Sequence, residues 1–164
     1  MLFLLFELGA DRYALDALQI AEVLPLVAIK HIPQAPAALS GAFNYRGAPV
    51  PVIDVSQLTL GRPAARRLST RIVLVHYPCG DDGATHLLGL IVEKATQTER
   101  HAPADFVASG ITSADAPYLG PVATDARGLL QWIDVQTLLP PAFRDMLFNQ
   151  PMDDRWGLPT SKIC

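Results

Sequence analysis

The sequence predicts a mostly β protein made of two similar halves that pack together. Apolar runs of strand length alternate with Gly, Pro and Asp turn signals along most of the chain. Half of the 164 residues are hydrophobic and 18% are charged, which allows a sizeable core. An Arg-Gly turn followed by Ile-Asp-Val and a short helical pattern occurs twice, at residues 46–58 and 127–138. Because one half is too small to bury a good core alone, we expect the two halves to pack against each other.

The first half is predicted to contain six strands and two short helical pieces. They are expected in this order: strands at 1–8 and 12–15, an exposed strand around Ile20 and Glu22, a strand at 26–32, a helical turn at 36–39, a hairpin at 41–54 and a helix at 55–61 capped by Asp54 or Ser56.

The hairpin at 41–54 carries the strongest local signals. Gly47 can adopt the positive φ that a short hairpin turn often requires. Pro49 and Pro51 remove two N–H donors from one side of the second arm. This arm is therefore expected at the edge of a sheet, or at a point where it leaves the sheet.

The second half is predicted to repeat this plan and to end in a tail. Its elements are a basic loop at 62–67, strands at 71–77 and 86–92 with a continuation at 93–101, a turn at 103–106, a loop at 109–117, a hairpin of 118–123 and 129–133, and a helical segment at 134–146 that is broken at Pro140-Pro141. The arginines of the basic loop are interpreted as solvated, since three are too few for a nucleic-acid patch. We expect one domain over residues 1–147 and a mobile tail over 148–164, in which Trp156 is the large apolar residue.

Composition and charge argue against several classes of partner. A net charge of −3 without a basic block argues against nucleic acid as the main partner. The longest apolar runs are about six residues, far below the roughly 20 that a spanning helix needs, so no membrane insertion is expected. Cys79 and Cys164 are isolated thiols, which favours a reducing cytoplasm.

No motif for catalysis, cofactor binding or metal binding stands out. The four histidines are scattered without metal-ligand spacing, and the chain lacks a Gly-x-Ser-x-Gly elbow, a phosphate loop and a dinucleotide fingerprint. Asp81-Asp82-Gly83 fits a turn better than a calcium loop. A Cys79–His76 pair as nucleophile and base is a weak alternative, since such close pairs arise by chance. The function is therefore expected to lie in a surface.

The hairpin resembles a known signature. Asn44-Tyr45-Arg46-Gly47, with Pro51-Val52-Ile53-Asp54, looks like the Asn-Leu-Arg-Gly-x-x-x-Pro-Val-x-Asp-Leu pattern of CheW-like domains, the coupling proteins of bacterial chemotaxis-type arrays. Other segments resemble the family in the same order along about residues 1–147: Phe6-Glu7-Leu8-Gly9 with Tyr13-Ala14-Leu15, Ile20-Ala21-Glu22-Val23-Leu24, Ile32-Pro33-Gln34-Ala35-Pro36 with Gly41, Gly89-Leu90-Ile91-Val92-Glu93, and 129–139.

The resemblance implies a fold and a function. The fold would be two intertwined five-stranded SH3-like β-barrels with a few short helices. The function would be that of a non-enzymatic adaptor, which bridges the cytoplasmic tip of a methyl-accepting chemoreceptor and the regulatory domain of a CheA-like histidine kinase. Such a protein would be cytoplasmic and recruited to membrane receptor arrays. Tyr45 in place of leucine, Ser56 in place of arginine and Glu93 in place of aspartate suggest a divergent branch, such as Wsp-type surface sensing.

The same resemblance implies a receptor-binding groove on this chain. Its residues would be Ile20, Glu22, Val23, Ser40, Gly41, Asn44, Arg46 and Gly47. Ile20 and Val23 would be the apolar anchors for a receptor helix, and Arg46 would donate to a receptor carboxylate or carbonyl. Alternatively, Glu22 and Arg46 pair with each other within this protein; the two ideas are compatible.

An intracellular β-barrel module that binds a small ligand is the rival prediction. Its Trp and Tyr side chains would line a pocket. A large closed apolar pocket would favour the ligand-binding module, whereas an open groove between two barrels would favour the coupling protein.

Overall fold

The computed structural model describes residues 1–79 and 84–148, and these residues are mostly β, as predicted. The strands are β1 (Leu2–Leu8), β2 (Asp11–Asp16), β3 (Ile20–Pro25), β4 (Leu39–Tyr45), β5 (Ala48–Asp54), β6 (Arg71–Cys79), β7 (Ala84–Arg100), β8 (Leu119–Asp125) and β9 (Gly128–Ile133). The helices are α1 (Val55–Leu60) and α2 (Pro141–Phe148), with three 3₁₀ turns, η1 (Ala17–Gln19), η2 (Pro103–Asp105) and η3 (Val135–Thr137).

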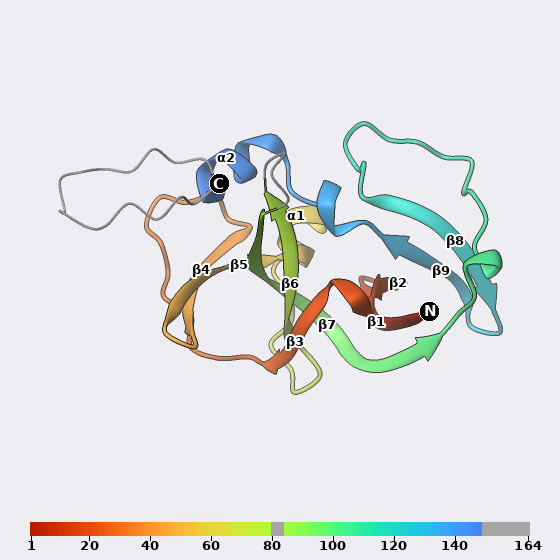
Figure 1. Cartoon of the computed structure of the whole chain (residues 1–164), viewed down its shortest axis with the longest axis horizontal. Coiled ribbons are helices and arrows are strands. Elements are labelled where there is room, and N and C mark those ends of the chain that lie inside the picture. Colours follow the sequence, from red (N-terminus) through yellow and green to blue (C-terminus); the bar gives the residue numbers. More distant parts are fainter. Residues whose placement is uncertain (80–83, 149–164) are drawn as a thin grey trace.

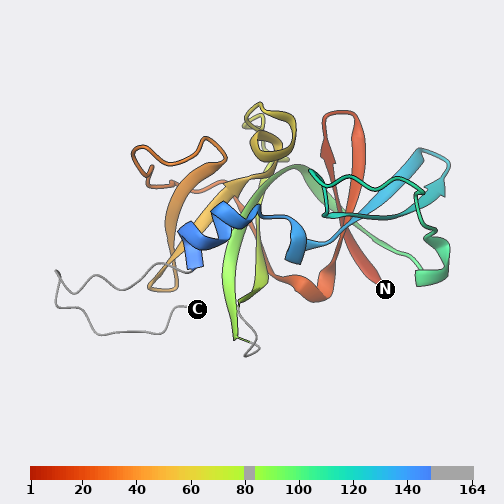
Figure 2. The same cartoon turned by 90° about the horizontal axis from the view of Figure 1, so that it is seen from above.

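The long strand β7 joins two five-stranded halves (Figure 1). In the first half the strand order is β3-β6-β7-β5-β4, and in the second it is β7-β1-β2-β9-β8. Figure 2 shows β7, in green, running from one half to the other. The amino-terminal strands β1 and β2 belong to the second half, whereas β3, which follows them, belongs to the first. The two halves are therefore intertwined.

The strand pairing repeats between the halves, as the sequence repeat predicts. Each half contains one parallel pair, β5 with β7 in the first and β2 with β9 in the second. Each also has one isolated bridge that ties an edge strand to the segment opposite, Lys30 to Ala42 and Val107 to Val122. The two sheets therefore follow one plan.

Three apolar clusters fill the structure. The first-half cluster lies between Phe43, Val52 and Leu74, and the second-half cluster lies around Phe3 and Leu130. The largest, here called the seam cluster, contains buried residues of both halves: Leu4, Phe6, Leu8, Leu15, Leu39, Ile53, Val55, Val73, Val75, Tyr77, Leu88, Leu90, Val92, Ala95, Ile133, Val135, Leu138, Leu139 and Phe148. Burial of this shared surface holds the halves together.

Two predicted elements differ in the structure. Residues 26–32 do not form a strand. Within them only Lys30 pairs with another strand, through a single bridge to Ala42 of β4. The segment 134–146 is broken at Pro140-Pro141 as predicted, but its first piece is the 3₁₀ turn η3; α2 begins at Pro141, where a proline is tolerated in the first turn. Residues 149–164, which make up most of the predicted tail, lie outside the described residues.

The prolines of β5 mark a change in pairing rather than an outer edge. Pro49 is paired with Asn44 and Pro51 with Ala42 of β4, and over this stretch β4 is the neighbour of β5 in the sheet. From Val52 onward, β5 also pairs with β7 and is an inner strand. The prediction of a strand at the edge of a sheet, or at a point where it leaves the sheet, fits the first part of β5, which has β7 on neither side; the remainder of β5 is an inner strand.

A candidate docking site on β3 and the β4–β5 hairpin

A β-bulge in β3 decides which way the predicted apolar anchors face. Ile20 pairs with Val75 of β6 and Glu22 with Leu74, so Ala21 is the extra residue. Directly paired residues share one face of a sheet. Ile20, opposite Val75, and Val23, opposite Val73, therefore lie on the seam side, and Ile20 packs against the seam cluster. Regular alternation would have placed the two on opposite faces.

Glu22 lies on the other face of β3. Its partner Leu74 belongs to the first-half cluster, on which Leu24 and Tyr45 also pack. The Tyr45 hydroxyl donates a short hydrogen bond to Glu22 Oε2, which links β4 to β3. This bond is the first cause of the raised pKa of the Tyr45 phenol, followed by burial. Tyr45 is thus part of the site, and its replacement of the usual leucine was the only sequence signal for it.

Arg46 is the most available charge of the site. Its guanidinium lies 3.7 Å from Glu22 Oε2 and 5.1 Å from the centre of the Tyr45 ring. The Arg46 side chain is still 78% exposed. A loose ion pair of this kind contributes little stability, and most guanidinium donors stay available to a partner. The predicted Glu22–Arg46 pair is therefore present, and it does not occupy Arg46.

The turn that presents Arg46 is a two-residue hairpin turn. Arg46 has φ +50° and Gly47 has φ +87°, as a turn with two positive φ values requires. The Asn44 side chain accepts a hydrogen bond from the Gly47 N–H at 2.8 Å. The exposed Asn44 therefore fixes the turn with its oxygen, and its amide group can also reach solvent or a partner.

Gly41 is buried and has a structural reason to be glycine. Its φ is +139°, and a Cβ there would lie 2.0 Å from the Lys30 carbonyl oxygen. The close approach permits the two backbone hydrogen bonds between Lys30 and Ala42, at 2.8 and 3.0 Å. Ser40, beside it, is half-buried. Of the eight predicted residues, the structure brings Glu22, Asn44, Arg46 and Gly47 together, places Ile20 and Val23 on the seam face, and sets Gly41 beneath the surface.

The second half contains a related pair in a tighter form. Arg127, in the β8–β9 turn, forms a short ion pair with Glu99 of β7, and Glu99 also contacts His101 at 3.1 Å. The Arg127 side chain is 50% exposed. The two hairpins share one design, but Arg127 is held by its acid whereas Arg46 is not.

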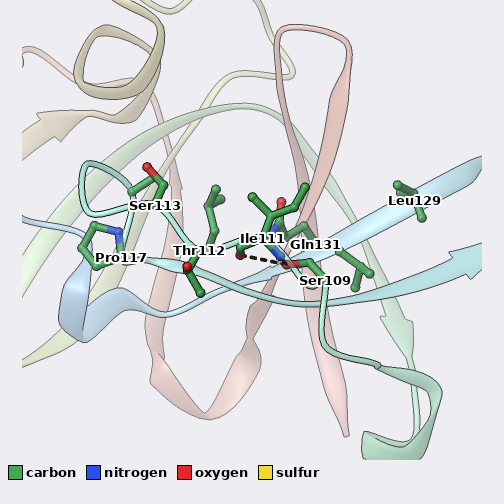
Figure 3. Close-up of a pocket in the computed structure, with 10 residues that line it drawn as sticks. Ser109, Ile111, Thr112, Ser113, Pro117, Leu129 and Gln131 are labelled. Atoms are coloured by element: carbon green, nitrogen blue, oxygen red, sulfur yellow. Dashed lines mark hydrogen bonds between the residues drawn. The ribbon is translucent and has the colours of Figure 1, made fainter.

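The pockets of the structure bear on the small-ligand alternative. One of about 330 Å³ lies between the loop before β8 and strands β8 and β9, and its lining residues include Ser109, Ile111, Leu129 and Gln131 (Figure 3). Neither Trp nor Tyr lines it, and Ile111 and Leu129 are exposed to solvent. This pocket is open rather than closed. A second pocket, of about 480 Å³, includes Tyr118 in its lining, and it is open as well. Neither is the closed apolar pocket that would favour a ligand-binding module.

Among the described residues, no group of three or more His, Cys, Asp or Glu side chains is placed to hold a metal ion. No helix within residues 1–79 and 84–148 is long and apolar enough to cross a bilayer.

Comparison with known proteins identifies the family. The model of the CheW-like domain matches residues 2–142. The chain is 26% identical to the chemotaxis protein CheW of Klebsiella aerogenes over 144 residues, 84% of this chain and 80% of that protein. It is 34% identical to the chemotaxis protein CheW of Treponema pallidum over 50 residues, a match that spans only 29% of that protein.

A solved structure agrees on the fold. The scaffolding protein TtCheW of Thermoanaerobacter tengcongensis superposes with a TM-score of 0.72 at 24% identity, over 85% of this chain and 87% of that one. The family model, the Klebsiella relative and the fold agree over most of the chain. The protein belongs to the CheW-like domain family, whose members are non-enzymatic scaffold adaptors of chemotaxis signalling.

Proposed function

We propose that this protein couples the cytoplasmic tip of a methyl-accepting chemoreceptor to the regulatory domain of a CheA-like histidine kinase, in the cytoplasm at membrane receptor arrays. The observation that carries the proposal is Arg46, a largely exposed guanidinium on a rigid turn, within a chain of the CheW-like family. A fixed turn presents the charge without a large loss of conformational entropy on binding.

The receptor contact would use both faces of β3. Val23 is partly exposed on the seam side and would pack against an apolar side chain of a receptor helix. Arg46 and Asn44 would donate hydrogen bonds at the rim. Glu22, Gly41 and Gly47 would hold these groups in place, and half-buried Ile20 and Ser40 would support the strands beneath them.

Receptor binding is tested with two Arg→Ala variants, one in each hairpin turn. Arg46→Ala is expected to weaken binding of a purified receptor-tip fragment by about 30-fold, as truncation of an interface anchor does. The pair with Glu22 is loose, so the wild-type guanidinium is available to the receptor and its removal is felt there. Arg127→Ala, in the matching turn, is the control and should bind as the wild type does. Fluorescence anisotropy gives the affinities, and melting curves show whether each variant is folded. Unchanged receptor affinity for folded Arg46→Ala would refute the proposed role of Arg46.

Kinase coupling is tested separately. The protein is mixed with the regulatory domain of the CheA-like kinase encoded in the same genome, and size-exclusion chromatography with light scattering measures the mass of the eluted species. A co-eluting complex supports the coupling function. Elution as separate species at tens of micromolar, with receptor tip present and absent, would contradict it.

A further inference from the structure

The segment between α1 and β6 concentrates the positive charge of the chain. Residues 62–71, here called the arginine loop, are this connection together with Arg71, the first residue of β6, and contain four arginines and no acidic residue. The rest of the chain contains nine Lys or Arg against sixteen Asp or Glu, so the loop is a cationic patch on an otherwise acidic protein. Figure 1 shows this segment, in yellow, projecting beyond the strands near β3.

The backbone of the loop is fixed by two acidic side chains beneath it. Asp54 Oδ2 accepts a hydrogen bond from the Ala64 N–H at 2.9 Å, and Glu93 Oε1 accepts one from Ala65 at 2.5 Å. The Thr70 hydroxyl, which is buried, donates to the Ala65 carbonyl. The loop is therefore ordered although it has no regular secondary structure.

The carboxylates that fix the loop do not neutralise it. Among the described residues, no acid forms an ion pair with the four arginines of the loop. Arg71 instead donates to the Leu68 carbonyl and so steadies the tip of the loop. Arg66 and Arg67 are exposed, and neither forms an ion pair with an acidic side chain of the described residues.

The tip of the loop also presents an apolar side chain. Leu68 is 93% exposed, and it occupies a turn in which the Thr70 N–H donates to the Arg67 carbonyl at 3.0 Å. A single exposed leucine is ordinary on a protein surface. Here it stands on a hydrogen-bonded turn directly after Arg66 and Arg67, and the Arg71 guanidinium donates to its carbonyl. This arrangement suits an apolar anchor with a charged rim.

We propose that the arginine loop docks an acidic protein segment that carries apolar side chains. Guanidinium groups match carboxylates in a two-pronged geometry, and the fixed backbone reduces the entropy lost on binding. No aromatic side chain lies within the loop to stack on a base, which disfavours single-stranded nucleic acid. One leucine is too little apolar area for stable attachment to a lipid surface. This inference does not depend on the proposed receptor and kinase contacts.

The test uses the full chain and a synthetic probe. The probe is a fluorescently labelled helix with glutamate and leucine at i and i+4 spacing, and its twin has glutamine in place of each glutamate. Wild-type protein is expected to bind the glutamate peptide and not its twin, with an affinity that falls as salt is added. Arg66→Glu with Arg67→Glu is expected to weaken binding about tenfold or more, and Leu68→Ser about threefold.

A charge-matched control separates the loop from overall charge. Arg100→Glu with Arg144→Glu makes the same change in net charge at two exposed arginines outside the loop, and it should bind within about twofold of wild type. Circular dichroism confirms that each variant is folded. The proposal is overturned if wild-type protein ignores the glutamate peptide, if the control loses as much affinity as the loop variant, or if RNA or anionic lipid vesicles bind the loop more tightly than the peptide does.

Discussion

Gly41→Ala should destabilise the fold more than any other glycine substitution in the β4–β5 hairpin. The new Cβ would lie 2.0 Å from the Lys30 carbonyl oxygen and 2.9 Å from Ile29 Cγ2, distances that force the backbone to move. The two hydrogen bonds of the Lys30–Ala42 bridge would be lost at about 1 kcal/mol each. The φ of +139° adds about 1–2 kcal/mol of strain for alanine. The free energy of unfolding should fall by about 3–4 kcal/mol in total.

Gly47→Ala is the matched control. Gly47 also has a positive φ, +87°, but a Cβ there would have nothing within 4 Å, so only about 1 kcal/mol is expected. Urea unfolding followed by circular dichroism gives both values, and the melting temperature should fall by about 10 °C for Gly41→Ala. Equal losses for the two variants would refute the close approach of Gly41 to Lys30. Any loss of receptor binding by Gly41→Ala should then be corrected for its unfolded fraction.

Three further predictions follow from contacts at the hairpins. Glu22→Gln should lower the pKa of Tyr45 toward its ordinary value, because the carboxylate no longer accepts a hydrogen bond from the phenol. Ultraviolet titration, with Tyr45→Phe as the reference, measures the pKa, and an unchanged value would contradict the contact. The Arg12 guanidinium donates to Asp125 at 2.6 and 3.0 Å and lowers the pKa of that carboxyl. The pair therefore stabilises the folded protein above the unfolded pKa of about 3.8, and this stabilisation is lost as pH falls through the lower folded pKa. Asp125→Asn should therefore be less stable than the wild type by on the order of 1 kcal/mol at pH 7, and the two should have similar stability in acid. Urea unfolding midpoints at both pH values measure the difference, and a difference that does not change with pH would refute the pair. Asp54→Ala removes the α1 cap and the bond to the arginine loop, and it should cost about 2–3 kcal/mol by urea unfolding, whereas a loss under 1 kcal/mol would argue against both bonds.

The fold was largely predictable because its signals are local and repeated. The Arg-Gly turn, the Asp54 cap of α1 and the alternating strands depend on residues a few positions apart. The sequence repeat also predicted two similar halves, and the strand pairing repeats accordingly. The family resemblance added the intertwined topology, which a single sequence does not reveal through local pattern.

The site was only partly predictable because it depends on register. The bulge at Ala21 brings Ile20 and Val23 to one face, and no local residue signals that shift. The contact of Tyr45 with Glu22 joins residues 23 positions apart, and Lys30 meets Ala42 at a single bridge where a whole strand was expected. The sequence by itself determined the turns, the cap, the repeat and the residues that bear charge. Only the tertiary structure decided which faces those residues share, since strand register is set by the packing of distant apolar side chains rather than by neighbours in the chain.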